Sequence, residues 1–143
     1  MSDNGNALVD WAVFARCRAE LGAAFVRILG YFREDGYKAV TAIEDAVRAK
    51  NSAGIVIPAH TLKGESLQFG AEPLGALAEL IEKTARRCVE LRQEPDELIE
   101  EVVKLRPLFE QTMALFDRET NPLVDRRPAF GRKVMPQQPF GRL

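Results

Sequence analysis

The amino-acid sequence predicts an all-α fold: an up-and-down four-helix bundle with a short N-terminal helix packed across it and an extended C-terminal tail. Apolar residues recur at spacings of three and four from residue 10 to residue 116, and no alternating stretch suggests a half-buried strand. The expected loops are short, so successive helices become antiparallel neighbours. The chain has 143 residues, 46% of them hydrophobic, which is enough for one compact domain.

The first half of the chain contains a short helix and a long one. Asp10 is a suitable N-cap for a short helix over residues 11–18. A long amphipathic pattern then covers residues 20–50, and Gly36 interrupts it at a kink or a local break. The pair Asn51-Ser52 is expected to supply a turn and the next N-cap.

Three more helices are expected after this turn. The first ends near Gly70, which suits the left-handed position that follows many helices. Glu72-Pro73 begins the second, and residues 93–95 break it. The last helix reaches Phe116, with Pro107 inside it as an expected kink.

Residues 117–143 differ from the bundle, which we assign to residues 1–116. This tail has four prolines, two glycines and few aliphatic residues, so disorder or an extended arm is expected. It carries 6 Lys and Arg against 3 Asp and Glu. The segments PAFGRK and QPFGRL, at 128–133 and 138–143, repeat Phe-Gly-Arg. The repeat is either a short docking motif or a chance recurrence in a basic solvated tail.

Composition excludes several classes of function. Residues 1–116 carry 14 Lys and Arg against 18 Asp and Glu, which argues against a nucleic-acid surface on the bundle. No apolar run reaches the roughly 18 residues of a membrane span, and no secretory signal is recognisable, so we expect a cytoplasmic protein without a membrane. Cys17 and Cys88 form no metal or redox motif and are expected to be reduced packing residues.

The segment PAHTLKGES, residues 58–66, holds the single histidine of the chain, His60. On a helix, successive residues rotate by about 100°. Two faces follow from this rotation. The face that holds the histidine consists of His60, Lys63, Gly64 and Leu67, and the expected core face consists of Leu62, Ser66 and Phe69.

This spacing suits phosphoryl chemistry. A neutral imidazole is a nucleophile near neutral pH, and its phosphorylated form carries about two negative charges. Lys63 would screen that charge, and Gly64 would leave room for a second protein to approach. Glycine inside a helix costs about 1 kcal/mol relative to alanine. The alternative is a surface or half-buried histidine without chemistry. One histidine and no nearby cysteine cluster exclude a metal site, and no hydrolase motif is recognisable.

The segment AHTLKGESLQFGAEPLGALAELIE, residues 59–82, resembles the signature of histidine phosphotransfer (HPt) domains. The usual pattern is Ala-His-x-Leu-Lys-Gly, followed by a small-residue stretch and an amphipathic helix. A looser resemblance extends from about Val9 to Phe116. The matching residues are Ala59, His60, Leu62, Lys63, Gly64 and the pair Gly70-Ala71.

The resemblance implies a monomeric phosphocarrier in a phosphorelay rather than an enzyme. His60 would be the phosphoacceptor, Lys63 its charge partner and Gly64 the clearance position. The partners would be the receiver domain of a response regulator and a hybrid sensor histidine kinase. The chain would need no cofactor, because the receiver supplies the Mg²⁺. The alternative is a non-phosphorylated helical adaptor that binds receivers or another partner, in part through its tail.

Two positions depart from the family pattern. Glu65 replaces the usual Ser or Ala and is either an element of partner specificity or a solvated surface residue. Pro58 requires that the helix is kinked, which we favour, or that it begins at Pro58, which would place His60 in the first turn.

The partner would dock around His60. The expected contact residues are Glu65, Leu67, Phe14 and Leu21, whereas Phe25 is expected to be a core residue of the bundle.

Overall fold

The computed structural model describes residues 8–121, and all regular structure in this part of the chain is helical. Single 3-10 turns precede two of the helices, at Gly22–Ala24 and Asp96–Leu98. The helices in chain order are α2 (Trp11–Leu21), α3 (Phe25–Arg48), α4 (Ala53–Gln68), α5 (Glu72–Glu90) and α6 (Ile99–Thr120). The predicted all-helical class is confirmed, and each expected helix is present.

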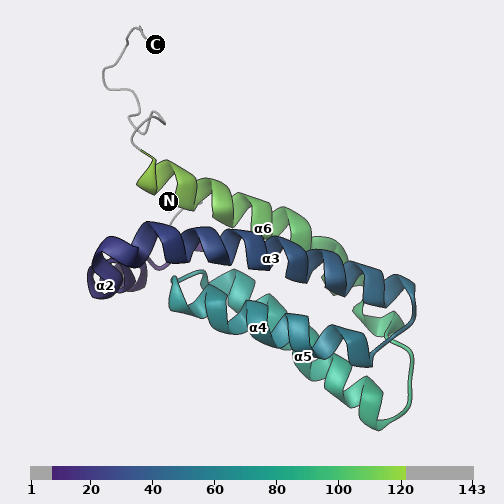
Figure 1. The fold of residues 1–143 in the computed structure, drawn as a ribbon. Coiled ribbons are helices and arrows are strands. Elements are labelled where there is room, and N and C mark those ends of the chain that lie inside the picture. Colours follow the sequence, from purple (N-terminus) through teal and green to yellow (C-terminus); the bar gives the residue numbers. More distant parts are fainter. Residues whose placement is uncertain (1–7, 122–143) are drawn as a thin grey trace, which may run out of the picture. The chain divides into compact units, whose positions relative to one another are not determined.

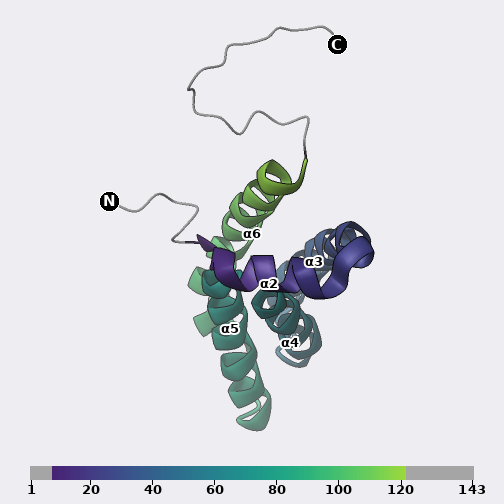
Figure 2. The same ribbon diagram turned by 90° about the vertical axis from the view of Figure 1, so that its left-hand side faces the viewer.

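The long helices form a bundle in which α4 packs against both α3 and α5 (Figure 1). Figure 2 shows the short α2 crossing the ends of α3, α4 and α5, as the sequence predicted. Residues up to Met113 belong to one compact unit, and a second unit begins at Ala114. In the second unit α6 continues to Thr120, whose Oγ1 donates a hydrogen bond to the Phe116 carbonyl at 2.9 Å. The helix therefore extends beyond Phe116, where we placed its end. The repeated Phe-Gly-Arg segments lie outside the described residues.

A row of five phenylalanine rings connects the helices of the first unit. Phe14 packs edge-on against Phe25 at 5.3 Å between centroids, and Phe25 packs against Phe69 at 5.9 Å. Phe69 stacks on Phe32 at 5.3 Å, and Phe32 meets Phe109 at 6.3 Å. All five side chains are buried. The row joins α2, α3, the end of α4 and α6. The expected core position of Phe25 is confirmed.

The start of α2 is fixed to the end of α4. The Asp10 carboxylate accepts hydrogen bonds from the backbone N–H groups of Ala12 and Val13 at 3.0 and 3.3 Å, which confirms the predicted N-cap. The Asp10 N–H donates to the Gly70 carbonyl at 2.8 Å. Gly70 has φ +83°, the predicted left-handed conformation, and a Cβ there would lie 2.6 Å from the Asp10 carbonyl oxygen. Glycine at this position therefore permits both the turn and the contact.

The opposite end of α4 is fixed by the predicted turn. Asn51 Oδ1 accepts a hydrogen bond from the Gly54 N–H at 3.0 Å, so within the predicted pair Asn51-Ser52 it is Asn51 that provides the side-chain cap. The Ser52 hydroxyl instead donates to the Gln93 carbonyl at 2.7 Å. This bond ties the α3–α4 turn to the loop after α5.

Two expectations about the helices are wrong, and one open question is decided. The short helix α2 extends to Leu21 rather than to Arg18. Helix α4 begins at Ala53, which places Pro58 in its interior, as we favoured, and excludes a helix start at Pro58. Helix α3 passes through Gly36 without a break. A Cβ at Gly36 would lie 2.5 Å from the Phe109 ring, so Gly36 lets α6 approach α3 closely.

None of the helices between residues 8 and 121 combines the length and the apolar character that a membrane span requires.

The contact at Gly36 leads to a stability prediction. We expect Gly36→Val to lower the free energy of unfolding by about 1–3 kcal/mol, because the added side chain collides with the buried Phe109 ring. Gly30→Val on the same helix is the matched control, since a Cβ at Gly30 meets nothing within 4 Å. Urea unfolding followed by circular dichroism measures both variants. Equal losses of stability would contradict the role of Gly36.

Candidate functional site

Buried residues of α4 determine which side of this helix faces solvent. Ala59 and Leu62 are fully buried, and they hold the opposite side of the helix in the core. The His60 side chain is 61% exposed, whereas that of Lys63 is 25% exposed. The two faces predicted for this helix are therefore observed, with the histidine directed towards solvent.

Small residues on α5 allow α4 to come close. A Cβ at Gly75 would lie 2.6 Å from the side chain of Leu67, so the absence of a side chain at Gly75 makes room for the leucine. Ala78 and Ala85 of α5 and Ala59 of α4 are also fully buried. This close packing brings an acidic side chain of α5 within reach of the histidine.

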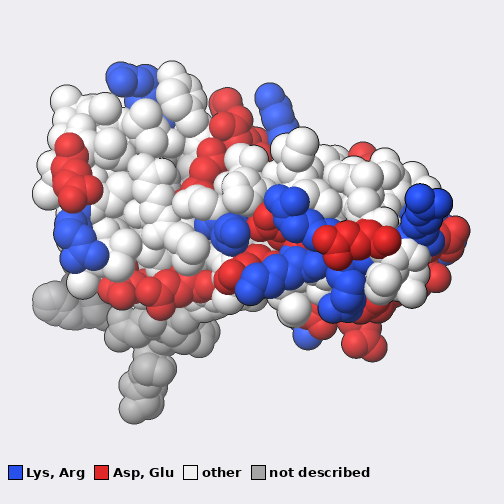
Figure 3. Space-filling view, turned by 90° about the horizontal axis from the view of Figure 1, so that it is seen from below, with Lys and Arg blue, Asp and Glu red and all other residues white. Residues whose placement is uncertain are grey.

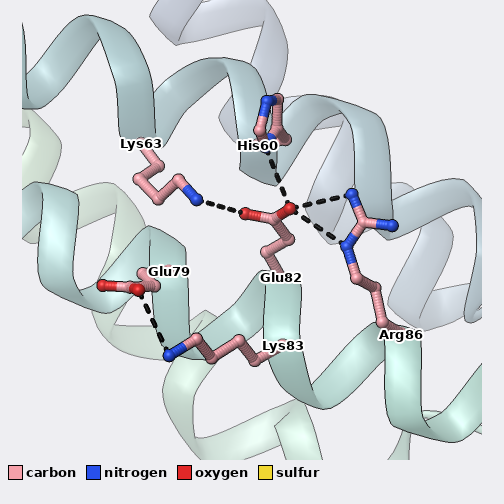
Figure 4. A network of polar contacts seen from close by, with 6 residues as sticks. All are labelled: His60, Lys63, Glu79, Glu82, Lys83 and Arg86. Atoms are coloured by element: carbon pink, nitrogen blue, oxygen red, sulfur yellow. Dashed lines mark hydrogen bonds and ion pairs between the residues drawn. The ribbon is translucent and has the colours of Figure 1, made fainter.

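That side chain is Glu82, which lies at the centre of four interacting residues that we call the Glu82 network (Figure 4). Glu82 Oε2 lies 2.9 Å from His60 Nδ1. The same oxygen accepts hydrogen bonds from Arg86 Nε and Nη2 at 3.0 and 2.9 Å. Lys63 Nζ forms an ion pair with the other oxygen, Oε1, at 3.0 Å. Two residues of α4 and one of α5 thus share the carboxylate of Glu82.

The environment of Glu82 keeps its carboxylate charged. Only 6% of the side chain is exposed, and this burial by itself raises the pKa. The interactions with Lys63, Arg86 and His60 outweigh burial and lower the pKa to about 2. Two cations and one imidazole therefore face a permanent negative charge at neutral pH.

The contact with Glu82 determines which ring nitrogen of His60 is free to react. A carboxylate only accepts hydrogen bonds, so it favours the tautomer of the neutral ring that carries its proton on Nδ1. The lone pair then resides on Nε2. Figure 4 shows that this second nitrogen points away from Glu82. The arrangement presents a nucleophilic nitrogen on an exposed face.

The surface beside His60 is open. Gly64 is exposed, and a Cβ at this position meets nothing within 4 Å. Leu67 is 46% exposed, and Ile57, three residues before the histidine, is also exposed. Apolar side chains therefore flank His60 along α4.

The two other predicted contact residues, Phe14 and Leu21, belong to α2. Phe14 is buried between the rings of Trp11 and Phe25, so its expected place in a docking surface is wrong. Leu21 is half-buried at the end of α2. The aromatic row recruits Phe14 to the core, which apolar spacing alone could not distinguish from a surface position.

Glu65 lies outside the Glu82 network. Its Oε1 is buried and has no hydrogen-bond partner among the described residues. Burial raises the pKa of this carboxyl group, and the charge of Asp35 raises it further. The interpretation of Glu65 as a solvated surface residue is therefore wrong.

Glu82 and Arg86 were not among the site residues predicted from the sequence. Glu82 follows Ile81 directly on the stripe of α5 that also holds Ala78 and Ala85, and an acid is unusual at such a position. Arg86 stands four residues later, at the spacing of a helical ion pair. The pair Glu82–Arg86 could have been noticed from the sequence of α5. No feature of that segment, however, indicates that Glu82 contacts His60 on α4.

Charges of both signs lie around the site. Seen from the side of α4 and α5, Lys and Arg alternate with Asp and Glu beside a broad uncharged area (Figure 3). This face therefore has no continuous basic patch. Residues 8–121 also contain no group of three or more His, Cys, Asp or Glu side chains that could hold a metal ion.

Comparison with known proteins identifies the family. The model of the Hpt domain matches residues 27–115. The chain belongs to the Hpt domain family. Hpt domains are phosphotransfer proteins of two-component signalling that carry phosphoryl groups rather than act as kinases.

The helical arrangement also resembles a solved member of this family. The crystal structure of histidine-containing phosphotransfer protein B (HptB) from Pseudomonas aeruginosa PAO1 matches with a TM-score of 0.68 and 23% identity. The match covers 78% of this chain and 93% of that chain. At this identity the likeness shows the fold of the Hpt domain. A comparison with curated protein sequences gives no match.

The lowered pKa of Glu82 predicts an acid-dependent loss of stability. The folded pKa of about 2 lies below the ordinary value of 4.5, so the carboxylate stabilises the fold above pH 4.5. This contribution is lost as the pH falls from 4.5 through 2. We expect the free energy of unfolding to fall less steeply over this range in Glu82→Gln than in the wild type.

The matched control for this measurement is Glu79→Gln. Glu79 is on the same helix, is 44% exposed and pairs with Lys83 at 3.2 Å (Figure 4). Urea unfolding at pH 6 and pH 2.5 should show the wild-type slope in this control. The same slope in Glu82→Gln as in the wild type would contradict the assignment.

Proposed function

We propose that this Hpt domain is a phosphorelay intermediate and that His60 is its phosphoacceptor. The observation that carries the proposal is the contact between His60 Nδ1 and the buried Glu82 carboxylate, which leaves Nε2 free on an exposed surface. The signature residues Lys63 and Gly64 lie on the same helix beside it.

The reaction would be a reversible transfer between His60 and the aspartyl phosphate of a receiver domain. The Nε2 lone pair forms the new N–P bond, and the P–O bond to the receiver aspartate breaks with its electrons left on the carboxylate oxygen. The proton remains on Nδ1, where the ring becomes positively charged and Glu82 stabilises it. The same steps in reverse pass the phosphoryl group from His60 to the aspartate of a second receiver.

Lys63 and Gly64 would serve the two other requirements of this transfer. The Lys63 ammonium lies one turn from His60 and would offset the charge of the arriving phosphoryl group. The open space at Gly64 would admit the backbone of the receiver together with the Mg²⁺ that the receiver holds. Leu67, Leu21 and Glu65 remain candidate contact residues at the rim.

The proposed partners are the receiver domain of a response regulator and a hybrid sensor histidine kinase, with the domain acting as a monomer in the cytoplasm. The division into a bundle at 1–116 and a tail at 117–143 remains a prediction. Deletion of residues 122–143 tests it, because a separate tail should leave the thermal stability of the bundle unchanged.

Phosphorylation of His60 is tested by incubation with a receiver domain that carries ³²P on its aspartate. We expect the wild type to acquire a label that is labile in acid and stable in alkali, as a phosphoramidate bond is. His60→Gln should acquire none while keeping its far-UV circular dichroism. Binding of the receiver without any transfer of label would favour the adaptor function instead.

The role of Gly64 is tested by a graded series, Gly64→Ala and Gly64→Gln. The free domain has room for both side chains, so its thermal stability should be kept or slightly raised. Affinity for the receiver, measured by calorimetry, should fall with side-chain size, by about tenfold or more for the glutamine because a clash costs at least about 1.4 kcal/mol. Unchanged affinity for both variants would refute the clearance role.

A further inference from the structure

We propose that Arg86 is a positioning residue for phosphotransfer, which keeps Glu82 on His60 Nδ1 when Lys63 leaves the carboxylate for the phosphoryl group. The inference rests on the proposed function of His60. It assigns different tasks to the two cations of the Glu82 network.

The contacts of Arg86 and Lys63 with Glu82 differ in kind. Arg86 donates two hydrogen bonds to Oε2, the oxygen that also contacts His60. Lys63 approaches the other oxygen, Oε1, through a single contact of 3.0 Å. The guanidinium therefore holds Oε2 through two hydrogen bonds, whereas a single contact joins the ammonium to Oε1, so the ammonium can leave without releasing Oε2.

The two cations also differ in their attachment to the fold. Arg86 and Glu82 stand at i, i+4 on α5, so their contact does not depend on any movement of α4. Lys63 shares α4 with His60 and can turn its flexible side chain towards a group on the imidazole. The Arg86 side chain is 55% exposed, but its donors are directed at the buried oxygen (Figure 4).

The buried carboxylate of Glu82 needs a cation beside it throughout the transfer. Glu82 is almost completely buried, and a buried carboxylate without a partner is strongly unfavourable. If Lys63 moves to a phosphoryl group of about two negative charges, Arg86 is the remaining cation on Glu82. Arg86 would then prevent both protonation of the carboxylate and its withdrawal from Nδ1.

The test compares Arg86→Gln and Arg86→Lys with Lys83→Gln. Lys83 lies on the same helix, is 72% exposed and pairs with Glu79 rather than with Glu82, so its loss removes the same charge without touching the network. Because His60 is the single histidine, the ¹⁵N spectrum of the imidazole reports its tautomer without assignment. Transfer rates from a phosphorylated receiver are measured for the same proteins.

We expect Lys83→Gln to match the wild type in tautomer and in rate. Arg86→Gln should shift part of the neutral ring to the Nε2–H tautomer and slow transfer by about tenfold, the lower range measured when a metal-bound histidine loses the group that orients it. Arg86→Lys should restore part of both. Lys63→Ala should slow transfer while keeping the Nδ1–H tautomer, because Arg86 still holds Glu82.

The outcomes also separate this inference from the proposed function. If His60→Gln still acquires the label, the proposed function fails. If the label depends on His60 but Arg86→Gln equals Lys83→Gln in tautomer and rate, this inference alone fails. Circular dichroism of each variant identifies a general loss of fold, and in that case Arg86→Lys provides the decisive comparison.

Discussion

The candidate site depends on one buried carboxylate. Glu82 is placed where few acids are found, and its charge is tolerated because donors from two helices converge on it. This condition requires the spacing and the relative rotation that α4 and α5 have. The same condition selects the tautomer of His60 and keeps Lys63 near the ring. A buried carboxylate thus determines the electrostatic environment of the exposed histidine.

Small residues and fixed helix ends hold α4 and α5 where their side chains can converge on Glu82. Gly75 and the buried alanines bring α4 and α5 close enough for a glutamate to reach across. The phenylalanine row packs at the end of α4 and connects this end to α2, α3 and α6. A larger side chain at Gly75 would have to displace the side chain of Leu67.

The fold and half of the site could be predicted because they rest on local geometry. The positions of His60, Lys63 and Gly64 follow from the helical repeat alone, and the cap at Asp10 and the left-handed Gly70 follow from short sequence signals. Glu82 lies 22 residues from His60 in sequence, so its contact depends on the register between two helices. Phe14 shows a related limit, because an apolar residue on a short helix does not reveal which neighbours will cover it.

The attachments at the two ends of α4 have a consequence for association. Asp10 and Gly70 hold one end, and the bond between Ser52 and Gln93 holds the other, with the histidine between them. A helix that is fixed in this way has little conformational entropy left to lose when a partner arrives. The histidine face would therefore act as a rigid template, and the cost of ordering would fall on the loops of the incoming protein.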